Sequence, residues 1–363
     1  MRIVVKIGTN TLTRKNKIDG SLIRDIASQI ALLKKNGHEF IIVTSGAIGL
    51  GASELCITEK IRDMKLKQAA AAIGQIILME KYHLYFKKHG LNAAQLLLSY
   101  SDFSERKRYL NLRNSLETLL KLNVIPIINE NDPVSIDEIG PSFGDNDRLS
   151  ALVASKTDAD MLLILTDVAG LYTKNPKLAS DAKIIQLVES ITPEIERSAQ
   201  GTGSVFSVGG MKSKINAAKI CMSAGCDVVI AYGREKHVIE NAINHKTGTI
   251  FVAKKKLSNK RRWILHSQPK GIILLDCGGA KEALLNNNSL LPAGIASCDG
   301  TFEKNDVIEI KEVGKAIVDY SSREIEKIKG KKLSEIKSIL GSKGHVVVKQ
   351  ENIVFYEQHN EDY

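Results

Sequence analysis

The sequence predicts an α/β fold in which a mainly parallel, doubly wound sheet is followed by a small β-rich domain. Two observations carry this prediction. From Arg2 to about Val252, short apolar runs alternate with helically spaced segments of about ten or more residues. Strands separated by such helices pair in parallel, and the helices cover both faces of the sheet. After Trp263, short strand-like runs separated by Gly, Asn and Asp predominate, which is typical of a β-rich domain.

The expected strands of the first region are apolar runs that end at polar or glycine-rich turns. In chain order they span residues 3–7, 40–43, 94–98, 124–128, 161–165, 228–231 and 249–252. The expected helices lie between them, at residues 22–35, 58–88, 103–122, from 147 onward, 210–224 and 237–245. The first of these helices shows the pattern clearly, because its apolar residues have helical spacing and Asn36-Gly37 ends it.

Spacing and charge divide the chain into four parts. Residues 1–253 form the alternating region, and the basic run KKKLSNKRR begins a segment, 254–266, that we expect to be a linker. Residues 267–350 form the expected β-rich domain, with strands at 272–275, 307–310, 316–318 and 346–348 and helices at 280–285 and near 333–340. Residues 351–363 remain as a C-terminal tail. The basic run could instead contact nucleic acid, and the sequence leaves that alternative open.

Composition and the order of apolar segments indicate which classes of protein this chain could belong to. No apolar run approaches the roughly 20 residues that span a bilayer. The chain begins with a strand pattern and not with the layout of a signal peptide, so we expect a cytoplasmic protein with no membrane partner. The five cysteines form no CxxC pair, which favours buried, reduced thiols. The net charge of +10 fits an anionic substrate, a nucleic-acid partner or merely a basic proteome.

Polar segments follow four of the expected strands at the point where each strand ends. They are Gly8-Thr9-Asn10, Thr44-Ser45-Gly46-Ala47, Asn129-Glu130-Asn131-Asp132 and Thr166-Asp167. Right-handed crossovers bring the carboxyl ends of parallel strands to one edge, where ligands bind in such folds. Asp145, Asn146 and Asp147 open the next helix. One of them could be a cap, but three exceed what capping needs, so we expect a binding crevice at this edge.

The crevice lacks several familiar catalytic patterns. Neither a Walker A sequence nor a GxGxxG or GxSxG pattern is present, and none of the eight histidines falls in a motif. Three glycine segments could instead cradle phosphate with backbone N–H groups: Gly8-Thr9, residues 46–51 and Gly209-Gly210.

Lysines supply positive charge to the crevice. Lys6 lies inside an apolar strand and needs an anionic partner, unless it reaches solvent from an edge strand. Lys212 and Lys214 lie in the first turn of the helix that Gly210 opens, where cations oppose the helix dipole and a phosphate ligand would explain them. Lysines from two loops, together with Mg²⁺, would meet the needs of phosphoryl transfer.

Six motifs, taken together, resemble the amino-acid kinase family. They are VVKIGTN, VTSGAIGLG, NENDPVS, FGDNDRLSALVA, LTDVAGLYTKNP and GGMKSKINAAK, and they follow one another in the family's order from Val4 to about Ala253. The later sequence SLLPAGI, followed by GTF, resembles the PUA domain that is appended to many of these kinases. The resemblance implies an amino-acid kinase domain over residues 1–253 and a PUA-like barrel over residues 267–350.

Within the family, the motifs resemble the branch that acts on L-glutamate. This resemblance implies that ATP, with Mg²⁺, phosphorylates the side-chain carboxylate of L-glutamate to L-glutamyl 5-phosphate, the first step of L-proline biosynthesis. A carboxylate with a pKa of about 4.3 is already ionised at neutral pH, so no general base is needed. The alternatives are a family phosphotransferase that acts on aspartate, carbamate or UMP, and an RNA-binding protein on a kinase-like scaffold.

The resemblance also implies roles for individual residues. Catalytic roles fall to Lys6, Asp147 and Lys214, with Asp147 orienting the lysines. Substrate binding falls to Ser45, Asp132, Asn146 and, as a substrate or metal contact, Asp145. Nucleotide binding falls to Lys6, Gly8, Thr166, Asp167, Val208, Gly209, Gly210, Met211, Lys212, Ser213 and Lys214. The family usually carries Thr at the position of Val208, so a hydroxyl contact is lost there while backbone contacts remain. No residue set is assigned to a metal.

Partners of the protein follow from the resemblance as well. It implies a homo-oligomer, a dimer or a tetramer, and inhibition by proline. PUA domains bind RNA in other proteins, but aromatic residues make up only 5% of this chain and offer few stacking platforms. We therefore expect a structural or regulatory role for the second domain.

Overall fold

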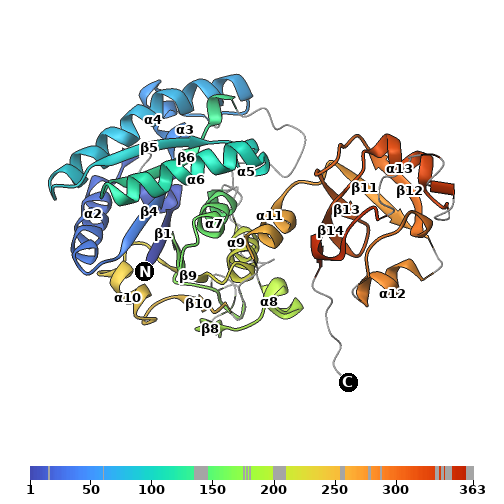
Figure 1. The fold of residues 1–363 in the computed structure, drawn as a ribbon. Coiled ribbons are helices and arrows are strands. Elements are labelled where there is room, and N and C mark those ends of the chain that lie inside the picture. The colour runs from blue at the N-terminus through green and yellow to red at the C-terminus, as the bar shows by residue number, and fades with distance from the viewer. Residues whose placement is uncertain are drawn as a thin grey trace. The chain divides into compact units, whose positions relative to one another are not determined.

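The structure, a computed structural model, describes residues 1–14, 17–59, 61–134, 146–174, 176, 179, 181–198, 210–253, 258–276, 279–286, 288–331, 335–336, 339 and 346–356. For Asn259, Arg262 and His266 it describes the backbone alone. The chain divides into two compact units, Met1–Lys256 and Leu257–Tyr363 (Figure 1). Within the described ranges, no helix combines the length and the apolarity that crossing a bilayer requires.

An eight-stranded sheet forms the centre of the first unit. Its strands in spatial order are β5 (Ala93–Leu98), β6 (Ile125–Glu130), β4 (Glu39–Val43), β1 (Arg2–Ile7), β7 (Met161–Thr166), β9 (Asp227–Tyr232), β10 (Thr249–Phe251) and β8 (Leu187–Val188). Neighbouring strands pair in parallel, except that β9 and β10 are antiparallel. The predicted mainly parallel sheet is confirmed. The edge strand β8 is the one that the sequence pattern did not predict.

Alternate residues of the central strands face two separate apolar cores. Ile3, Val5 and Ile7 of β1 lie in one core, and Val4 lies in the other. The first core is covered by α2 (Gly20–Lys35), α3 (Ala47–Glu54), α4 (Met64–Lys87) and α10 (Val238–Ile243). The second is covered by α5 (Ser101–Ser104), α6 (Arg106–Lys121), α7 (Asn146–Lys156) and α9 (Met211–Ser223). Helices α7 and α9 lie side by side (Figure 1), and both start at the carboxyl edge of the sheet. The predicted covering of both faces is confirmed.

The glycine segment 46–51, one of three that could cradle phosphate on the sequence alone, is mostly helical. Gly46, with a left-handed φ of 99°, precedes α3. A Cβ atom on Gly51 would lie 1.8 Å from the carbonyl oxygen of Ala70, and one on Gly74 would come similarly close to the backbone of α3. Gly51 and Gly74 therefore permit the close approach of α3 and α4. Beyond the first turn, helical N–H groups are bonded within the helix, so this segment cannot cradle phosphate along its whole length.

The second unit contains a five-stranded sheet, which agrees with the predicted β-rich domain. Its spatial order is β12 (Ile295–Gly300), β11 (Gly271–Leu275), β13 (Val307–Ile310), β14 (Gly314–Ile317) and β15 (Ile353–Phe355). Helices α12 (Ala280–Leu285) and α13 (Ser322–Ile328) contribute Leu284, Ile325 and Ile328 to its core. The strand expected at 346–348 forms only an isolated bridge between Leu290 and Val348. Most of the helix expected near 333–340 lies outside the described residues.

Part of the segment expected to be a linker is folded. Residues of 254–266 include α11 (Asn259–His266), whose Ile264 packs against Val307 and Val354 of the second unit. The pattern also did not predict α3, β12 and β15, and β15 lies in the segment that was expected to be a C-terminal tail. The remaining elements that it did not predict are short: α1 (Thr9–Leu12), β2 (Thr13–Arg14), β3 (Lys17–Ile18), α8 (Pro193–Ser198) and the 3-10 turns η1 (Asp132–Val134), η2 (Pro292–Gly294) and η3 (Gln350–Asn352).

Candidate active site

Lys6 lies in the middle of the sheet and not at its edge. Its strand, β1, pairs with β4 on one side and with β7 on the other. Because side chains alternate along a strand, Lys6 shares a face with Val4, whose core lies beneath α7 and α9. Only 7% of Lys6 is exposed. The alternative that Lys6 reaches solvent from an edge strand is therefore wrong, and its charge needs a partner inside the protein.

Asp147, in the first turn of α7, is that partner. It is fully buried, and one of its carboxylate oxygens lies 2.6 Å from Nζ of Lys6. The other oxygen lies 3.0 Å from Nζ of Lys214 and accepts a hydrogen bond of 2.6 Å from the hydroxyl of Ser213. Ser213 and Lys214 lie at the start of α9. Two predicted catalytic lysines, Lys6 of β1 and Lys214 of α9, therefore both contact the carboxylate of the third predicted catalytic residue, Asp147 of α7.

This centre is charged and favours an anion. Burial by itself would raise the pKa of Asp147, but the ammonium groups of Lys6 and Lys214, together with the Ser213 hydroxyl, hold it well below its usual range. Asp147 is therefore ionised at neutral pH. Two ammonium groups and one carboxylate leave one net positive charge. Because α7 and α9 both start here, the positive ends of their dipoles add to it.

Lys6, Asp147 and Lys214 together are called the lysine centre below. Gly8, Thr166 and Asp167 lie beside it, at the ends of β1 and β7. A Cβ atom on Gly8 would lie 3.4 Å from Nζ of Lys6, so glycine keeps the approach to this ammonium group open. The carboxylate of Asp167 accepts hydrogen bonds from the Thr166 hydroxyl at 3.1 Å and from the side-chain amide of Asn10 at 3.2 Å. These residues thus form a polar rim next to the charged centre.

The start of α9 carries most of the other residues that we predicted to bind nucleotide. Gly210 precedes the helix, and its first residues are Met211, Lys212, Ser213 and Lys214. Lys212 is exposed, whereas Met211 and Lys214 are buried. Backbone N–H groups of the first turn have no partner within a helix and are available to an anion. Val208, Gly209 and Asp145, which we also predicted as site residues, lie outside the described residues.

A chain of side-chain amides lies next to the lysine centre, on the side toward β4 and β6. Nδ2 of Asn146 donates to Oγ of Ser45 at 2.8 Å and to Oδ1 of Asn129 at 3.3 Å. Nδ2 of Asn129 donates to Oε1 of Gln75 at 2.8 Å. Since Asn146 precedes Asp147 in the chain, the start of α7 joins the amide chain to the charged centre. The structure therefore brings two of the predicted substrate residues together.

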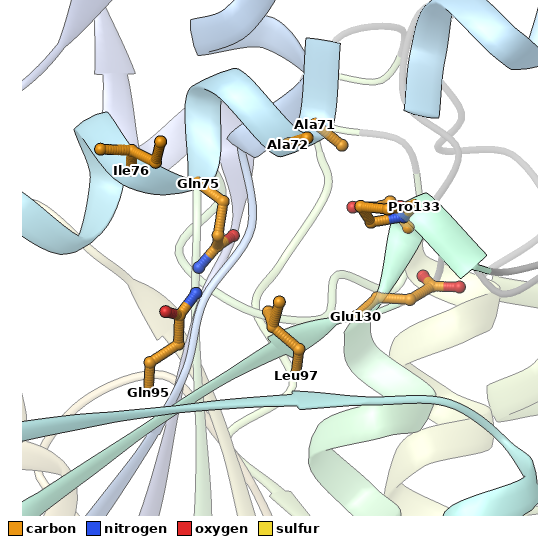
Figure 2. Close-up of a pocket in the computed structure, with 9 residues that line it drawn as sticks. Ala71, Ala72, Gln75, Ile76, Gln95, Leu97, Glu130 and Pro133 are labelled. Atoms are coloured by element: carbon orange, nitrogen blue, oxygen red, sulfur yellow. The ribbon is translucent and has the colours of Figure 1, made fainter. Parts of the chain in front are cut away.

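Asp132 lies beside this amide chain, in the turn η1 after β6. It lines a cavity of about 270 Å³ together with Glu130, Gln75 and Gln95 and with apolar residues of α4 and β5 (Figure 2). Burial raises the pKa of Asp132 to about 6. A carboxylate with so little solvation is well suited to meet the positive charge of a ligand. Gln75 lines the cavity and also bonds to Asn129, and so connects Asp132 with the other residues that we predicted to bind substrate.

The sequence pattern missed two residues of the site. Asn129 belongs to a motif that we used, but no role was assigned to it. Gln75 lies in α4 among alanine, isoleucine and glycine residues, so the single polar residue in that stretch was the available signal. Both are buried, with exposed fractions of 2% and 8%. Buried amides that bond to each other over long sequence distances leave no periodic pattern.

The chain is similar to known proteins over both of its units. A sequence model of the amino acid kinase family matches residues 1–232. The chain belongs to the amino acid kinase family. A model of the PUA domain matches residues 274–340. The predicted fold class, an amino-acid kinase fold followed by a PUA domain, is therefore confirmed.

Relatives from archaea and bacteria are similar to this family member over nearly their whole length. A protein of Methanosarcina barkeri named glutamate 5-kinase is 48% identical, over 97% of this chain and 96% of its own. A glutamate 5-kinase of Caldanaerobacter subterraneus is 45% identical, over 99% and 98%. Among solved structures, carbamate kinase from Giardia lamblia bound to AMP-PNP covers 70% of this chain and 98% of its own, with a TM-score of 0.51 and 17% identity. That likeness shows the fold alone.

Proposed function

We propose that this chain is a glutamate 5-kinase. It transfers the terminal phosphoryl group of ATP to the side-chain carboxylate of L-glutamate, and the products are L-glutamyl 5-phosphate and ADP. This reaction is the first step of L-proline biosynthesis. The observation that carries the proposal is the Lys6–Asp147–Lys214 centre beside Ser45 and Asn146. Full-length relatives named glutamate 5-kinase support the choice of acceptor.

The lysine centre fits the difficulty of this reaction, which is the repulsion between two anions. The acceptor carboxylate is ionised at neutral pH and attacks the phosphorus without a general base, while the bond to ADP breaks. Lys6 and Lys214 come from different elements and so can contact the transferring group from two directions. Asp147 touches both ammonium groups and fixes their positions. Positive groups that are fixed in advance stabilise the transition state without reorganisation.

Nucleotide and amino acid take the two sides of this centre in our proposal. ATP binds beside Gly8, Thr166 and Asp167 and at the start of α9, at residues 208–214. L-Glutamate binds at Ser45, Asn146 and Asp132, and Asp145 is a further proposed contact. The ionised carboxylate of Asp132 meets the ammonium group of the substrate. This arrangement places the two ligands on either side of Lys6 and Asp147.

Mg²⁺ enters this proposal as an ion that ATP carries. Both oxygens of Asp147 are occupied by the lysines and Ser213, and no cluster of three or more metal-ligating side chains is found among the described residues. Mg²⁺ commonly uses one or two carboxylates together with substrate phosphates and water, so such a cluster is not required. The ion would neutralise charge on the phosphates. The residues present thus fit Mg²⁺ as part of the nucleotide complex.

The domain bounds, the cellular location and the oligomeric state are further parts of the proposal. We place the kinase domain at residues 1–253 and the PUA-like domain from residue 267 to the end of β15, in place of the predicted end at residue 350. We expect a cytoplasmic homo-oligomer, a dimer or a tetramer, in which the second domain has a structural or regulatory role. RNA binding by that domain is the competing possibility, and filter binding to tRNA tests it.

An acceptor panel tests the proposed function. ADP release is measured by a coupled assay with L-glutamate, L-aspartate, carbamate or UMP as acceptor, at saturating Mg-ATP. The proposal requires ADP release that depends on L-glutamate and is far slower with the other three. ADP release with carbamate or UMP, and none with L-glutamate, would replace it with another activity of the family.

A further inference from the structure

Gln75 is joined to the proposed substrate residues by an unbroken chain of hydrogen bonds. It lies in α4, is 8% exposed, and accepts a bond of 2.8 Å from Nδ2 of Asn129 through its carbonyl oxygen Oε1. Oδ1 of Asn129 accepts from Nδ2 of Asn146 at 3.3 Å, and the same Nδ2 donates to Ser45 at 2.8 Å. Gln75 is not one of the residues that bind ATP or L-glutamate in the proposed reaction.

The donor-to-acceptor direction of these hydrogen bonds determines whether the carbonyl oxygen or the NH₂ group of each amide remains without a partner among them. A primary amide has a donor end and an acceptor end. Because Gln75 presents its carbonyl oxygen, Asn129 must turn its NH₂ group toward Gln75 and its carbonyl oxygen toward Asn146. Asn146 must then use its NH₂ group for Asn129 and Ser45. A rotated Gln75 would set two donors against each other and remove the reason for this arrangement.

In Asn146, the atom that these hydrogen bonds leave unused is the carbonyl oxygen, which is an acceptor. Its Oδ1 is buried and has no hydrogen-bond partner in the part of the chain that the structure describes. A buried acceptor without a donor is unfavourable, so a ligand that brings a donor is favoured there. An ammonium group carries three N–H donors and no acceptor, and therefore fits such a site. The carboxylate of Asp132 supplies the opposite charge nearby.

We propose that Gln75 is a positioning residue which, through Asn129, turns the carbonyl oxygen of Asn146 toward the ammonium group of L-glutamate. This inference rests on the proposed function and deepens it. Gln75 does not touch the substrate in this account. It makes the site select for an α-amino group by fixing the direction of two amides.

A purely structural role is the competing explanation. Gln75 also lines the cavity near Asp132, where its side chain points from α4 toward that of Gln95 on β5 (Figure 2). If Gln75 merely filled this wall, leucine, with a similar volume, would replace it with little effect on substrate choice. If it orients the amides, leucine would leave Asn129 free to rotate, and the site would lose its preference for a donor.

The test compares L-glutamate with glutarate, which has the same two carboxylates but no α-amino group. For wild type, kcat/KM for L-glutamate should exceed that for glutarate by a wide margin. Gln75→Leu should lower this ratio about tenfold, mainly by a higher KM for L-glutamate, with kcat and the KM for ATP little changed. Gln75→Glu keeps an acceptor for Asn129 and should retain most of the ratio. If Gln75→Leu does not fold, Gln75→Lys replaces it, because lysine offers only donors and should lower the ratio too.

Gln29 provides a matched control. It is also 8% exposed, and its Oε1 accepts from the backbone N–H of Ile239, between α2 and α10 and away from the amide chain. Gln29→Leu, assayed at the same temperature, should leave the ratio of kcat/KM for L-glutamate to that for glutarate unchanged even where it lowers stability.

The outcomes separate this inference from the proposed function. Wild type without L-glutamate-dependent ADP release would overturn the proposed function. Wild type with that activity, combined with an unchanged ratio in Gln75→Leu or an equal fall in Gln29→Leu, would overturn the role of Gln75 alone.

Discussion

Nζ of Lys6 lies 2.6 Å from a carboxylate oxygen of Asp147, although one residue is in the first strand and the other opens α7. The register of β1 decides this contact, since Lys6 falls on the face that α7 covers. The second oxygen of Asp147 holds Lys214 in the same way. The carboxylate therefore sets the distance between two ammonium groups.

Lys214→Ala should reduce turnover by at least about 10²–10³-fold, because it removes one of the two charges that stabilise the transferring phosphoryl group. Steady-state ADP release and circular dichroism measure activity and folding in the same preparation. Lys219→Ala, on the same helix but in an exposed ion pair with Glu196, is the control and should retain activity. Wild-type turnover in Lys214→Ala would refute the assigned role.

Asp147→Asn should destabilise the fold by roughly 3–5 kcal/mol, because it leaves two buried lysines without their shared carboxylate. Urea unfolding at pH 7 measures this loss. The sign of the pH dependence follows from the lowered pKa of Asp147, whose ordinary value is 3.8. The stabilisation is fully present above that value and is lost as the pH falls toward the lower pKa of the folded state. Acid should therefore destabilise wild type more than the variant, and parallel curves would contradict this account.

Asp132→Asn should raise the KM for L-glutamate far more than the KM for ATP, because it removes the charge that meets the ammonium group. Since the pKa of Asp132 is raised to about 6, the wild-type KM for L-glutamate should also increase as the pH falls through 6. The variant should lack this increase. Equal effects on both substrates would mean that Asp132 is not in the glutamate site.

The same variant should be more stable than wild type at pH 8 without ligand. A carboxyl group with a raised pKa in the folded state costs stability where it is ionised, fully above about pH 6, and costs none once both states are protonated. The melting temperatures of the two proteins should therefore converge as the pH falls toward 3.8, the ordinary value. A lower melting temperature of Asp132→Asn at pH 8 would show that other contacts of this carboxylate dominate.

Gly74→Ala should destabilise the protein by about 1–3 kcal/mol or more, since its Cβ would lie 1.9 Å from the carbonyl oxygen of Ala47. Gly49→Ala is the matched control within α3, because a Cβ there meets nothing within 4 Å. It should be neutral or stabilising by about 0.5–1 kcal/mol, as alanine favours a helix. Urea midpoints measure both. Similar values for the two variants would contradict the close helix contact.

The sequence predicted the sheet because strands and helices follow local patterns, whereas the grouping of Lys6, Asp147 and Lys214 was implied by the resemblance to the amino-acid kinase family. Apolar runs identified the strands, and Lys6 and Asp147 were conspicuous as charges at a strand and a helix start. The packing role of Gly51 was not predicted, because a glycine that permits helix packing looks the same in sequence as one in a loop. The sequence did not predict that Gln75 and Asn129 belong to the site, because the hydrogen bond between them joins residues that are far apart in the chain. Such contacts become visible only when the fold is known.

Trapping of the acyl phosphate tests the central claim most directly. L-Glutamyl 5-phosphate is a reactive mixed anhydride, so hydroxylamine should convert it to the γ-hydroxamate, which is measured beside ADP. With Mg-ATP and L-glutamate, we expect hydroxamate and ADP in equal amounts, and at least about 10²-fold less of both from Lys214→Ala in the same time. Release of ADP without hydroxamate, or formation of both without L-glutamate, would contradict phosphoryl transfer to the side-chain carboxylate at this centre.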